Sequence, residues 1–241
     1  MKKQRKMNNY SELETKLGIK FKNEALLDKA FTHRSYLNEH RGDGIENNER
    51  LEFLGDAVLE LIISTYLFNN YPEKPEGELT NIRAAVVRTE SLAEESRALG
   101  FGQYLKMSKG EEDSGGKDKD YLLANTFEAV LGAIYLDQGF EVCIEYLNKT
   151  LLHKVSNIVE KNLFIDPKTQ AQEIIQAQFK VTPLYEVVKE EGPDHDKTFT
   201  VVLKVNQKEM GRGLGSSKQK AEEEAAKMAV ETINNQEKSL N

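Results

Sequence analysis

From residue 10 to about residue 163, apolar side chains recur at spacings of three and four, and no other feature of the sequence constrains the fold as strongly. This spacing places apolar side chains on one face of a helix, and strand-like alternation is hard to find in the same region. We therefore predict an all-α N-terminal domain over residues 10–160. Clear examples are Leu51, Leu54, Val58 and Leu61, and then Leu123, Phe127, Val130 and Ile134.

The pattern changes near Asp166 and Pro167. A short helical run precedes three alternating segments rich in Val, Thr and Phe, and an alanine-rich helical run follows them. This α-β-β-β-α order predicts a second, small α+β domain over residues 166–235. The helical runs cover residues 169–179 and 217–233, and the predicted strands cover residues 184–189, 198–205 and 207–214.

Three polar segments lie outside these elements. Residues 1–9 begin with MKKQRK, and no apolar segment follows, so we interpret them as a flexible basic tail rather than a signal peptide. Residues 41–47 and 109–120 are rich in Gly, Asp and Lys and are predicted to be loops. Long polar loops in a compact domain are often functional or mobile.

The composition excludes several classes of protein. The net charge is −7, which by itself argues against a nucleic-acid partner, so that function must be argued from local features. The single cysteine, Cys143, excludes a disulfide framework and a cysteine-rich zinc site, and we expect a buried thiol in a cytoplasmic protein. The longest apolar run, residues 57–68, contains Glu60 and is too short to span a bilayer, so we expect no membrane partner.

One predicted helix, residues 48–68, carries a stripe of acids. At 100° per residue, its four carboxylates fall within an arc of roughly 80°. A solvated helix face is the simpler interpretation of such a stripe. The rest of this helix is almost wholly apolar, however, which indicates a central helix whose crowded carboxylates need a divalent cation. The four acids are Glu49, Glu52, Asp56 and Glu60.

A second apolar helix, residues 124–136, carries Asn125 and Glu128 on one face. Facing helices that project oxygen ligands inward are a common way to hold Mg²⁺. Bound Mg²⁺ polarises a phosphoryl oxygen and supplies a hydroxide nucleophile, as phosphodiester hydrolysis requires. We expect no covalent nucleophile, since no Ser-His-Asp spacing is evident, and no small-molecule organic cofactor.

Three sets of polar residues stand out in the second domain. Thr169, Gln172, Glu173 and Gln176 share the first helical run, and by periodicity alone an ordinary exposed face is the favoured interpretation of them. His195 lies in the loop between two predicted strands. Ser217, Lys218 and Lys220 cluster at the start of the last helix, where free N–H groups favour phosphate.

Several segments resemble signatures of the bacterial ribonuclease III family. NERLEFLGDAVL (residues 48–59) matches its signature almost letter for letter, and residues 166–233 resemble a double-stranded-RNA-binding domain. Together the likeness covers nearly the whole chain. The other similar segments are FTHRSYLNEH (31–40), EGELTNIRAAVV (76–87), KGEEDSGG (109–116) and FEAVLGAIYLDQG (127–139).

This resemblance implies an endoribonuclease that cuts double-stranded RNA with Mg²⁺, or Mn²⁺ in its place, and leaves 5′-phosphate and 3′-hydroxyl ends with two-nucleotide 3′ overhangs. It further implies a homodimer that processes ribosomal RNA precursors and structured messages. It also implies that the polar residues singled out in the second domain contact duplex RNA, which is recognised through 2′-hydroxyls and phosphates. The implied metal ligands are Glu52, Asn125 and Glu128, with Asp56 and Glu128 most directly tied to catalysis and Glu49 and Glu76 lining the same acidic valley. The resemblance places Phe53 and Gly55 near the dimer seam, although a helix-interior glycine by itself indicates only a close backbone approach.

One position departs from the family pattern, which usually has Asp where this chain has Asn125. An amide oxygen still ligates Mg²⁺, but the site loses one negative charge. The residue is either a natural variant that keeps activity or a substitution that traps bound RNA uncut. The alternative to an active nuclease is therefore a cleavage-impaired RNA-binding dimer. A hydrolase of small nucleotides leaves the C-terminal domain unexplained.

Overall fold

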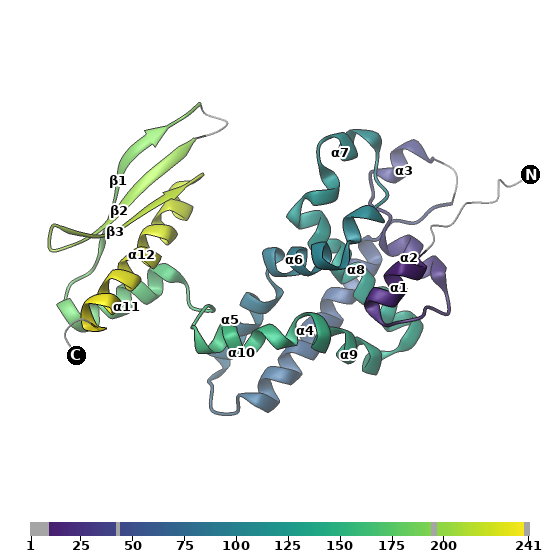
Figure 1. Ribbon diagram of the computed structural model, residues 1–241, viewed down its shortest axis with the longest axis horizontal. Helices are drawn as coiled ribbons and strands as arrows, with labels where there is room; N and C mark the ends of the chain where they lie inside the picture. The colour runs from purple at the N-terminus through teal and green to yellow at the C-terminus, as the bar shows by residue number, and fades with distance from the viewer. Residues whose placement is uncertain (1–9, 42–43, 194–196, 239–241) are drawn as a thin grey trace, which may run out of the picture. The chain divides into compact units, whose positions relative to one another are not determined.

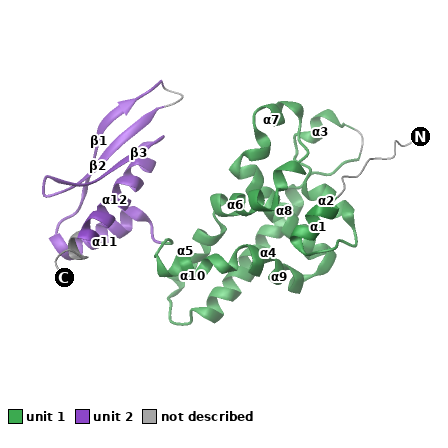
Figure 2. Cartoon of the chain, in the orientation of Figure 1, with its two compact units in different colours: residues 1–164 green, residues 165–241 purple. Residues whose placement is uncertain are grey.

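The computed structural model describes residues 10–41, 44–193 and 197–238 and divides into two compact units. Unit 1 is Met1–Phe164 and unit 2 is Ile165–Asn241, shown in different colours in Figure 2. Each unit is described by itself. Where the structure describes the chain, no helix is both long and apolar enough to cross a membrane.

Unit 1 is built of helices, as the apolar spacing predicts, and its described part has a single isolated β-bridge between Thr32 and Lys106. Figure 1 shows α4 and α8 in the middle of this unit, with shorter helices around them. The helices are α1 (Ser11–Leu17), α2 (Glu24–Ala30), α3 (Tyr36–Glu39), α4 (Glu49–Asn70), α5 (Glu76–Val87), α6 (Thr89–Leu99), α7 (Lys109–Asp113), α8 (Asp120–Gln138), α9 (Phe140–Thr150) and α10 (Val155–Glu160), with 3₁₀ turns η1 (Phe101–Gln103), η2 (Gly116–Asp118) and η3 (Leu152–Lys154).

Helices α4 and α8 touch backbone to backbone. A Cβ atom added at Gly55 would overlap the carbonyl oxygen of Glu128, and one added at Gly132 would overlap that of Leu51. The close approach expected from a helix-interior glycine is therefore present. Gly55 is buried against α8 of its own chain, and its position near a dimer seam stays a prediction.

Part of the polar segment 109–120 is ordered rather than a loop. The Ser108 side chain caps α7 by accepting a hydrogen bond from the Glu111 N–H group, at 3.3 Å. Lys119 Nζ lies 2.7 Å from a Glu111 carboxylate oxygen. Local capping and this ion pair make short helices of a stretch whose polar composition predicts a loop.

The single cysteine belongs to the core of unit 1, as expected. Cys143 is fully buried, and its thiol donates to the carbonyl oxygen of Gly139. Burial raises the pKa of this thiol to about 12, so it stays protonated and inert at neutral pH.

Unit 2 has the predicted α-β-β-β-α order. Its antiparallel sheet has the strand order β1-β2-β3, and α11 and α12 cover one face of it (Figure 1). Three glycines of β3, Gly211, Gly213 and Gly215, let the sheet lie directly on the backbone of α12, because a Cβ at any of them would overlap that helix. The elements are α11 (Pro167–Phe179), β1 (Leu184–Glu191), β2 (Thr198–Val205), β3 (Lys208–Gly215) and α12 (Lys218–Lys238).

Candidate active site and RNA-binding face

The crossing of α4 and α8 brings together acids that lie far apart in the sequence. Glu52 and Asp56 lie on either side of Gly55 on α4, Gly55 approaches the backbone of Glu128 on α8, and Asn125 lies one helical turn before Glu128. The Asn125 side chain hydrogen-bonds to Glu52, and Glu128 is in electrostatic contact with both Asp56 and Glu52. Four of the predicted site residues therefore form one wall, which we call the acidic wall: Glu52, Asp56, Asn125 and Glu128.

The acidic wall carries negative charge that no neighbouring cation compensates. Burial, then Asp56 and Glu52, raise the pKa of Glu128 to about 8. Burial, followed by Glu49 and with a smaller contribution from Asp56, raises the pKa of Glu52, and the hydrogen bond from Asn125 offsets part of this rise. Burial, then Glu60, raises the pKa of Asp56. Among the described residues, no Lys or Arg contributes to these three shifts.

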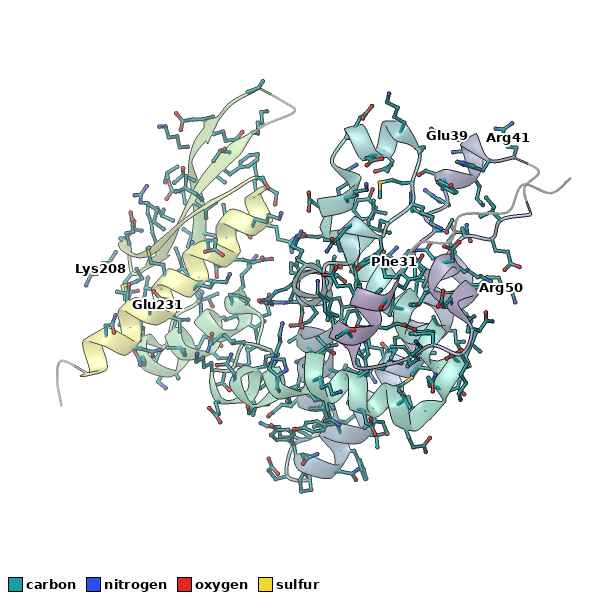
Figure 3. All side chains as sticks on the ribbon, turned by 45° about the vertical axis from the view of Figure 1, so that its right-hand side comes forward. Phe31, Glu39, Arg41, Arg50, Lys208 and Glu231 are labelled. Atoms are coloured by element: carbon teal, nitrogen blue, oxygen red, sulfur yellow. The ribbon has the colours of Figure 1, made fainter. Side chains whose placement is uncertain are left out.

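Arg50, the basic residue closest in sequence to the acidic stripe, does not neutralise this wall. It is exposed and projects from the surface of unit 1, whereas Phe31 lies in the interior (Figure 3). Its electrostatic contact is with Glu46 instead. The wall therefore keeps an unbalanced charge that a bound cation would relieve.

The donor atoms of the acidic wall fit a hard divalent cation, because they are carboxylate and amide oxygens without sulfur or imidazole nitrogen. Within the described ranges, no three His, Cys, Asp or Glu side chains are arranged to hold a metal ion. The predicted ligand set contains only two carboxylates, Glu52 and Glu128, since its third member is Asn125. The chemistry of the set suits Mg²⁺ or Mn²⁺, at a lower charge than three carboxylates would give.

A cavity of about 310 Å³ adjoins the acidic wall at Glu52 and Asn125. Glu49 lines it too, held by Asn47 Nδ2 at 2.9 Å and by Arg34 at 3.8 Å. The remaining lining residues are His33, Arg34, Asn48, Leu105, Tyr121, Leu122 and Thr126.

Glu76 lies apart from this cavity. It lines another, of about 500 Å³, between α4 and α5, and accepts a hydrogen bond from the Thr80 hydroxyl at 3.1 Å. The other lining residues are Ser64, Thr65, Leu67, Phe68, Leu79, Thr80 and Arg83. The fold of one chain therefore does not join Glu76 to the acidic wall.

In unit 2, the four polar residues singled out on α11 are all exposed, opposite the buried Ala171 and Ile175. The Thr169 hydroxyl also donates to the Asp166 carboxylate that caps this helix. These four, Thr169, Gln172, Glu173 and Gln176, present one polar face.

The start of α12 has its own polar cluster. The Ser217 hydroxyl accepts a hydrogen bond from the Lys220 N–H group at 3.2 Å and so caps the helix. Lys218 pairs with Glu190 at 3.2 Å and lies over the Phe199 ring, whereas the Lys220 side chain is exposed. His195, the remaining predicted RNA contact, lies outside the described residues.

Comparisons with known proteins account for both units. The family described as Ribonuclease-III-like matches residues 23–155, and the Double-stranded RNA binding motif matches residues 167–233. A protein named Ribonuclease 3 from Streptococcus agalactiae is 50% identical over 223 residues, which are 92% of this chain and 97% of that protein. The chain belongs to the ribonuclease III family. Ribonuclease 3 from Geobacillus kaustophilus is 48% identical, over 93% of this chain and 91% of its own.

Solved structures agree with this family assignment. The nuclease domain of ribonuclease III from Campylobacter jejuni is 41% identical and matches with a TM-score of 0.55, covering 59% of this chain and 95% of its own. As a ribonuclease III, the chain is an endoribonuclease that carries a double-stranded-RNA-binding domain. Its family is generally dependent on divalent metal.

Within this ribonuclease III, α4 also carries an exposed apolar stripe. Phe53, Leu61 and Phe68 are 80%, 55% and 73% exposed, and their spacing of eight and seven residues places them on one side of the helix. Large apolar side chains that gather on one exposed face mark an interaction surface.

Sequence reasoning assigned no role to three cavity residues of this ribonuclease III, His33, Arg34 and Tyr121. Two of them lie in the segment FTHRSYLNEH, whose likeness to the family was the available signal. This segment has no acid near its start, so the pattern of candidate metal ligands does not extend to it.

Proposed function

We propose that this ribonuclease III cleaves double-stranded RNA by Mg²⁺-dependent hydrolysis at the acidic wall. One observation carries the proposal: two helices whose backbones touch present acids with raised pKa values and no compensating cation. Such uncompensated charge on rigid, buried helices costs stability. It is retained where a cation and a phosphodiester occupy the site.

The residues of the wall have distinct roles in this proposal. Glu52, Asn125 and Glu128 hold Mg²⁺, or Mn²⁺ in its place, through their side-chain oxygens. When bound, the ion supplies the positive charge that stabilises a phosphoryl group and acidifies water. Asp56, beside Glu128, accepts a hydrogen bond from the attacking water and orients it toward phosphorus.

The products follow from which bond breaks. Water adds to phosphorus and the 3′-oxygen leaves with a proton, which gives 5′-phosphate and 3′-hydroxyl ends. Glu49 and Glu76 assist the placement of RNA rather than the chemical step. Glu76 lies outside the acidic wall of its own chain, so it helps to place the RNA at another point along the duplex.

The active form is a homodimer that buries the exposed α4 stripe around Phe53. The Campylobacter jejuni nuclease domain has a region involved in dimer formation, which supports this part of the proposal. Two active sites, each cutting one strand, leave two-nucleotide 3′ overhangs. Structured cytoplasmic transcripts, namely ribosomal RNA precursors and messages, are the expected substrates.

Unit 2 delivers the duplex by recognising its shape. The polar face of α11 meets 2′-hydroxyls of the minor groove, and Ser217, Lys218 and Lys220 meet phosphates. His195 is expected to reach the same duplex from the loop between β1 and β2.

The alternative is a dimer that binds duplex RNA without cutting it. Asn125 supports this alternative for two reasons. It leaves the ligand set with only two carboxylates, and its side-chain amide is already hydrogen-bonded to Glu52. Both the active nuclease and the non-cleaving dimer are expected to bind the metal ion more weakly than a site with three carboxylates. They differ only in how large this reduction in affinity is.

A labelled RNA duplex incubated with Mg²⁺, and in parallel with Ca²⁺, separates the two. Cleavage in Mg²⁺ with 5′-phosphate ends is expected for wild type. A loss of at least about a thousandfold is expected for Glu128→Gln, with duplex binding in Ca²⁺ retained. The matched control is Glu145→Gln, an exposed glutamate of α9. Binding in both ions without cleavage by wild type would establish the alternative.

A further inference from the structure

His33 has one ring nitrogen fully engaged by the protein. Ser35 Oγ lies 2.8 Å from His33 Nδ1, and the Ser35 backbone N–H group points at the same atom from 3.4 Å. The Ser35 hydroxyl oxygen in turn accepts a hydrogen bond from the Ser108 backbone N–H group at 3.0 Å.

These contacts determine which nitrogen carries the proton of the neutral ring. A backbone N–H group can only donate, so Nδ1 must accept from Ser35. Since Ser35 Oγ already accepts from Ser108, its own hydrogen is available for Nδ1 as well. The proton of the imidazole therefore lies on Nε2. Burial also lowers the pKa of His33, which favours the neutral ring.

Because Ser35 engages Nδ1, the Nε2 edge of the ring is the one left to face the cavity beside the acidic wall. His33 lines that cavity with Glu49, Glu52 and Asn125, and it is half-buried. Within the described part of the chain, Nε2 has no hydrogen-bond partner, and it is not among the fully buried polar atoms. A donor is thus presented to the cavity without a protein acceptor.

The backbone holds this donor in a fixed place. The His33 N–H group donates to the Lys106 carbonyl at 2.9 Å, and Thr32 accepts from the N–H group of Asn48, just before α4, at 2.9 Å. Segments on both sides of the cavity therefore anchor the histidine. Such preorganisation is what a group that orients a reacting chain requires.

We propose that His33 donates its Nε2–H group to a phosphate oxygen of the RNA strand, next to the phosphate that is cut. This inference rests on the proposed function of the acidic wall. A donor-only group pairs with an acceptor-only phosphate oxygen, whereas the carboxylate of Glu49 accepts hydrogen bonds from ribose hydroxyls. Being neutral, the ring offers this bond without adding charge beside the metal ligands.

The same tautomer defines what His33 does not do. Nε2 carries a hydrogen and has no lone pair to accept a proton, so the cavity-facing edge of the ring is not a general base. His33 therefore touches substrate as a positioning group. Ser35 acts through it, by holding Nδ1 as the acceptor.

Single-turnover cleavage of one duplex by four variants tests this role. His33→Ala is expected to lower the rate by roughly 10- to 100-fold, the effect of losing a hydrogen bond to a charged group. His33→Gln, whose amide offers a donor near the place of Nε2, is expected to recover most of it, and Ser35→Ala to fall between. His40→Ala is the matched control, since that ring is stacked on Tyr36 and bonds to its carbonyl.

A structural role would produce a different result. If His33 only supported the fold, His33→Ala and His33→Gln would lose rate and melting temperature together. Equal rates for wild type and His33→Ala would overturn the proposal. Cleavage by wild type is measured first, because its absence in Mg²⁺ would overturn the proposed function rather than the role of His33.

Modified duplexes identify the atom that His33 meets. At each position near the cut, a 2′-deoxy phosphate is compared with a 2′-deoxy methylphosphonate, which lacks one charged oxygen. One methylphosphonate is expected to slow wild type about tenfold or more and to leave His33→Ala no slower than before. Slowing of both proteins by the same factor at every position would overturn the proposal. The proposal would also be overturned if the effect of His33→Ala depended only on the 2′-deoxy change and not on the methylphosphonate. That result would assign the contact to a ribose hydroxyl.

Discussion

The two units of this ribonuclease III use the same packing device for different ends. In unit 1, Gly55 and Gly132 let two helices touch. In unit 2, Gly211, Gly213 and Gly215 let a strand lie on a helix. In both places the missing Cβ atoms permit backbone contact, which no larger residue would allow without separating the elements.

The difference lies in where the functional side chains are placed relative to that contact. The acids of unit 1 flank the glycine crossing itself, so the packing determines the distances between them. The RNA-facing residues of unit 2 lie on the exposed face of α11 and at the start of α12, where packing supports them only from behind. We therefore expect unit 1 to respond to single changes abruptly and unit 2 in small increments.

The largest expected effect comes from filling the glycine contacts. Gly55→Ala should destabilise unit 1 by about 3 kcal/mol or more and abolish cleavage, because the added methyl group meets the backbone of α8. Gly213→Ala should loosen unit 2 alone and weaken duplex binding. Hydrogen exchange reads the two units separately. Gly110→Ala, with no atom near its added Cβ, is the control. If the amides of unit 1 in Gly55→Ala were as well protected from hydrogen exchange as those of wild type, the proposed difference between the two units would be contradicted.

The pH dependence of stability is the next largest effect. Because the pKa of Glu128 is raised from 4.5 to about 8, the folded state binds a proton there that the unfolded state has lost. The contribution of this proton to the free energy of unfolding is on the order of a few kcal/mol. It is fully present below about pH 4.5 and is lost as pH rises through 8.

Urea unfolding of the metal-free protein at pH 5.5 and 8.5 measures this contribution. Glu128→Gln should lose less stability between these values than wild type, since its side chain does not ionise. Glu145→Gln should keep the wild-type dependence. Parallel curves for wild type and Glu128→Gln would show that Glu128 titrates at its ordinary pKa.

Restoring a charge to the acidic wall should have a moderate effect. Asn125→Asp is expected to lower the Mg²⁺ concentration for half-maximal cleavage by roughly tenfold, because a carboxylate binds the cation more strongly than an amide. Asn157→Asp, at an exposed position on α10, serves as the control. An unchanged magnesium curve would remove Asn125 from the ligand set.

Single lysines of unit 2 should matter least. Lys220→Ala is expected to weaken duplex binding a few-fold and to reduce the salt slope by about one, without altering cleavage of saturating RNA. Lys218→Ala should cost less, since Lys218 is already paired with Glu190. Lys227→Ala, paired with Glu224, is the control. A thousandfold loss from Lys220→Ala would break the contrast between the units.

Periodicity along one element was sufficient for much of the fold. The helix of residues 48–68 became α4, and the three alternating segments became β1, β2 and β3 with small shifts at their ends. The buried state of Cys143 followed from its apolar neighbours. Polar composition failed at residues 109–120, where the Ser108 cap and the pairing of Glu111 with Lys119 order the chain.

The sequence by itself determined the helix on which each acid lies, the order of the elements and the family. The tertiary structure decided which of these residues meet: it joined Glu128 to Asp56, packed Gly55 into the α4–α8 contact, and placed His33 beside the cavity. The reason is physical, because spacing along a chain reports the direction of a side chain around its own axis. Distances between elements arise only when their backbones cross, and that crossing depends on packing contributed by the whole unit.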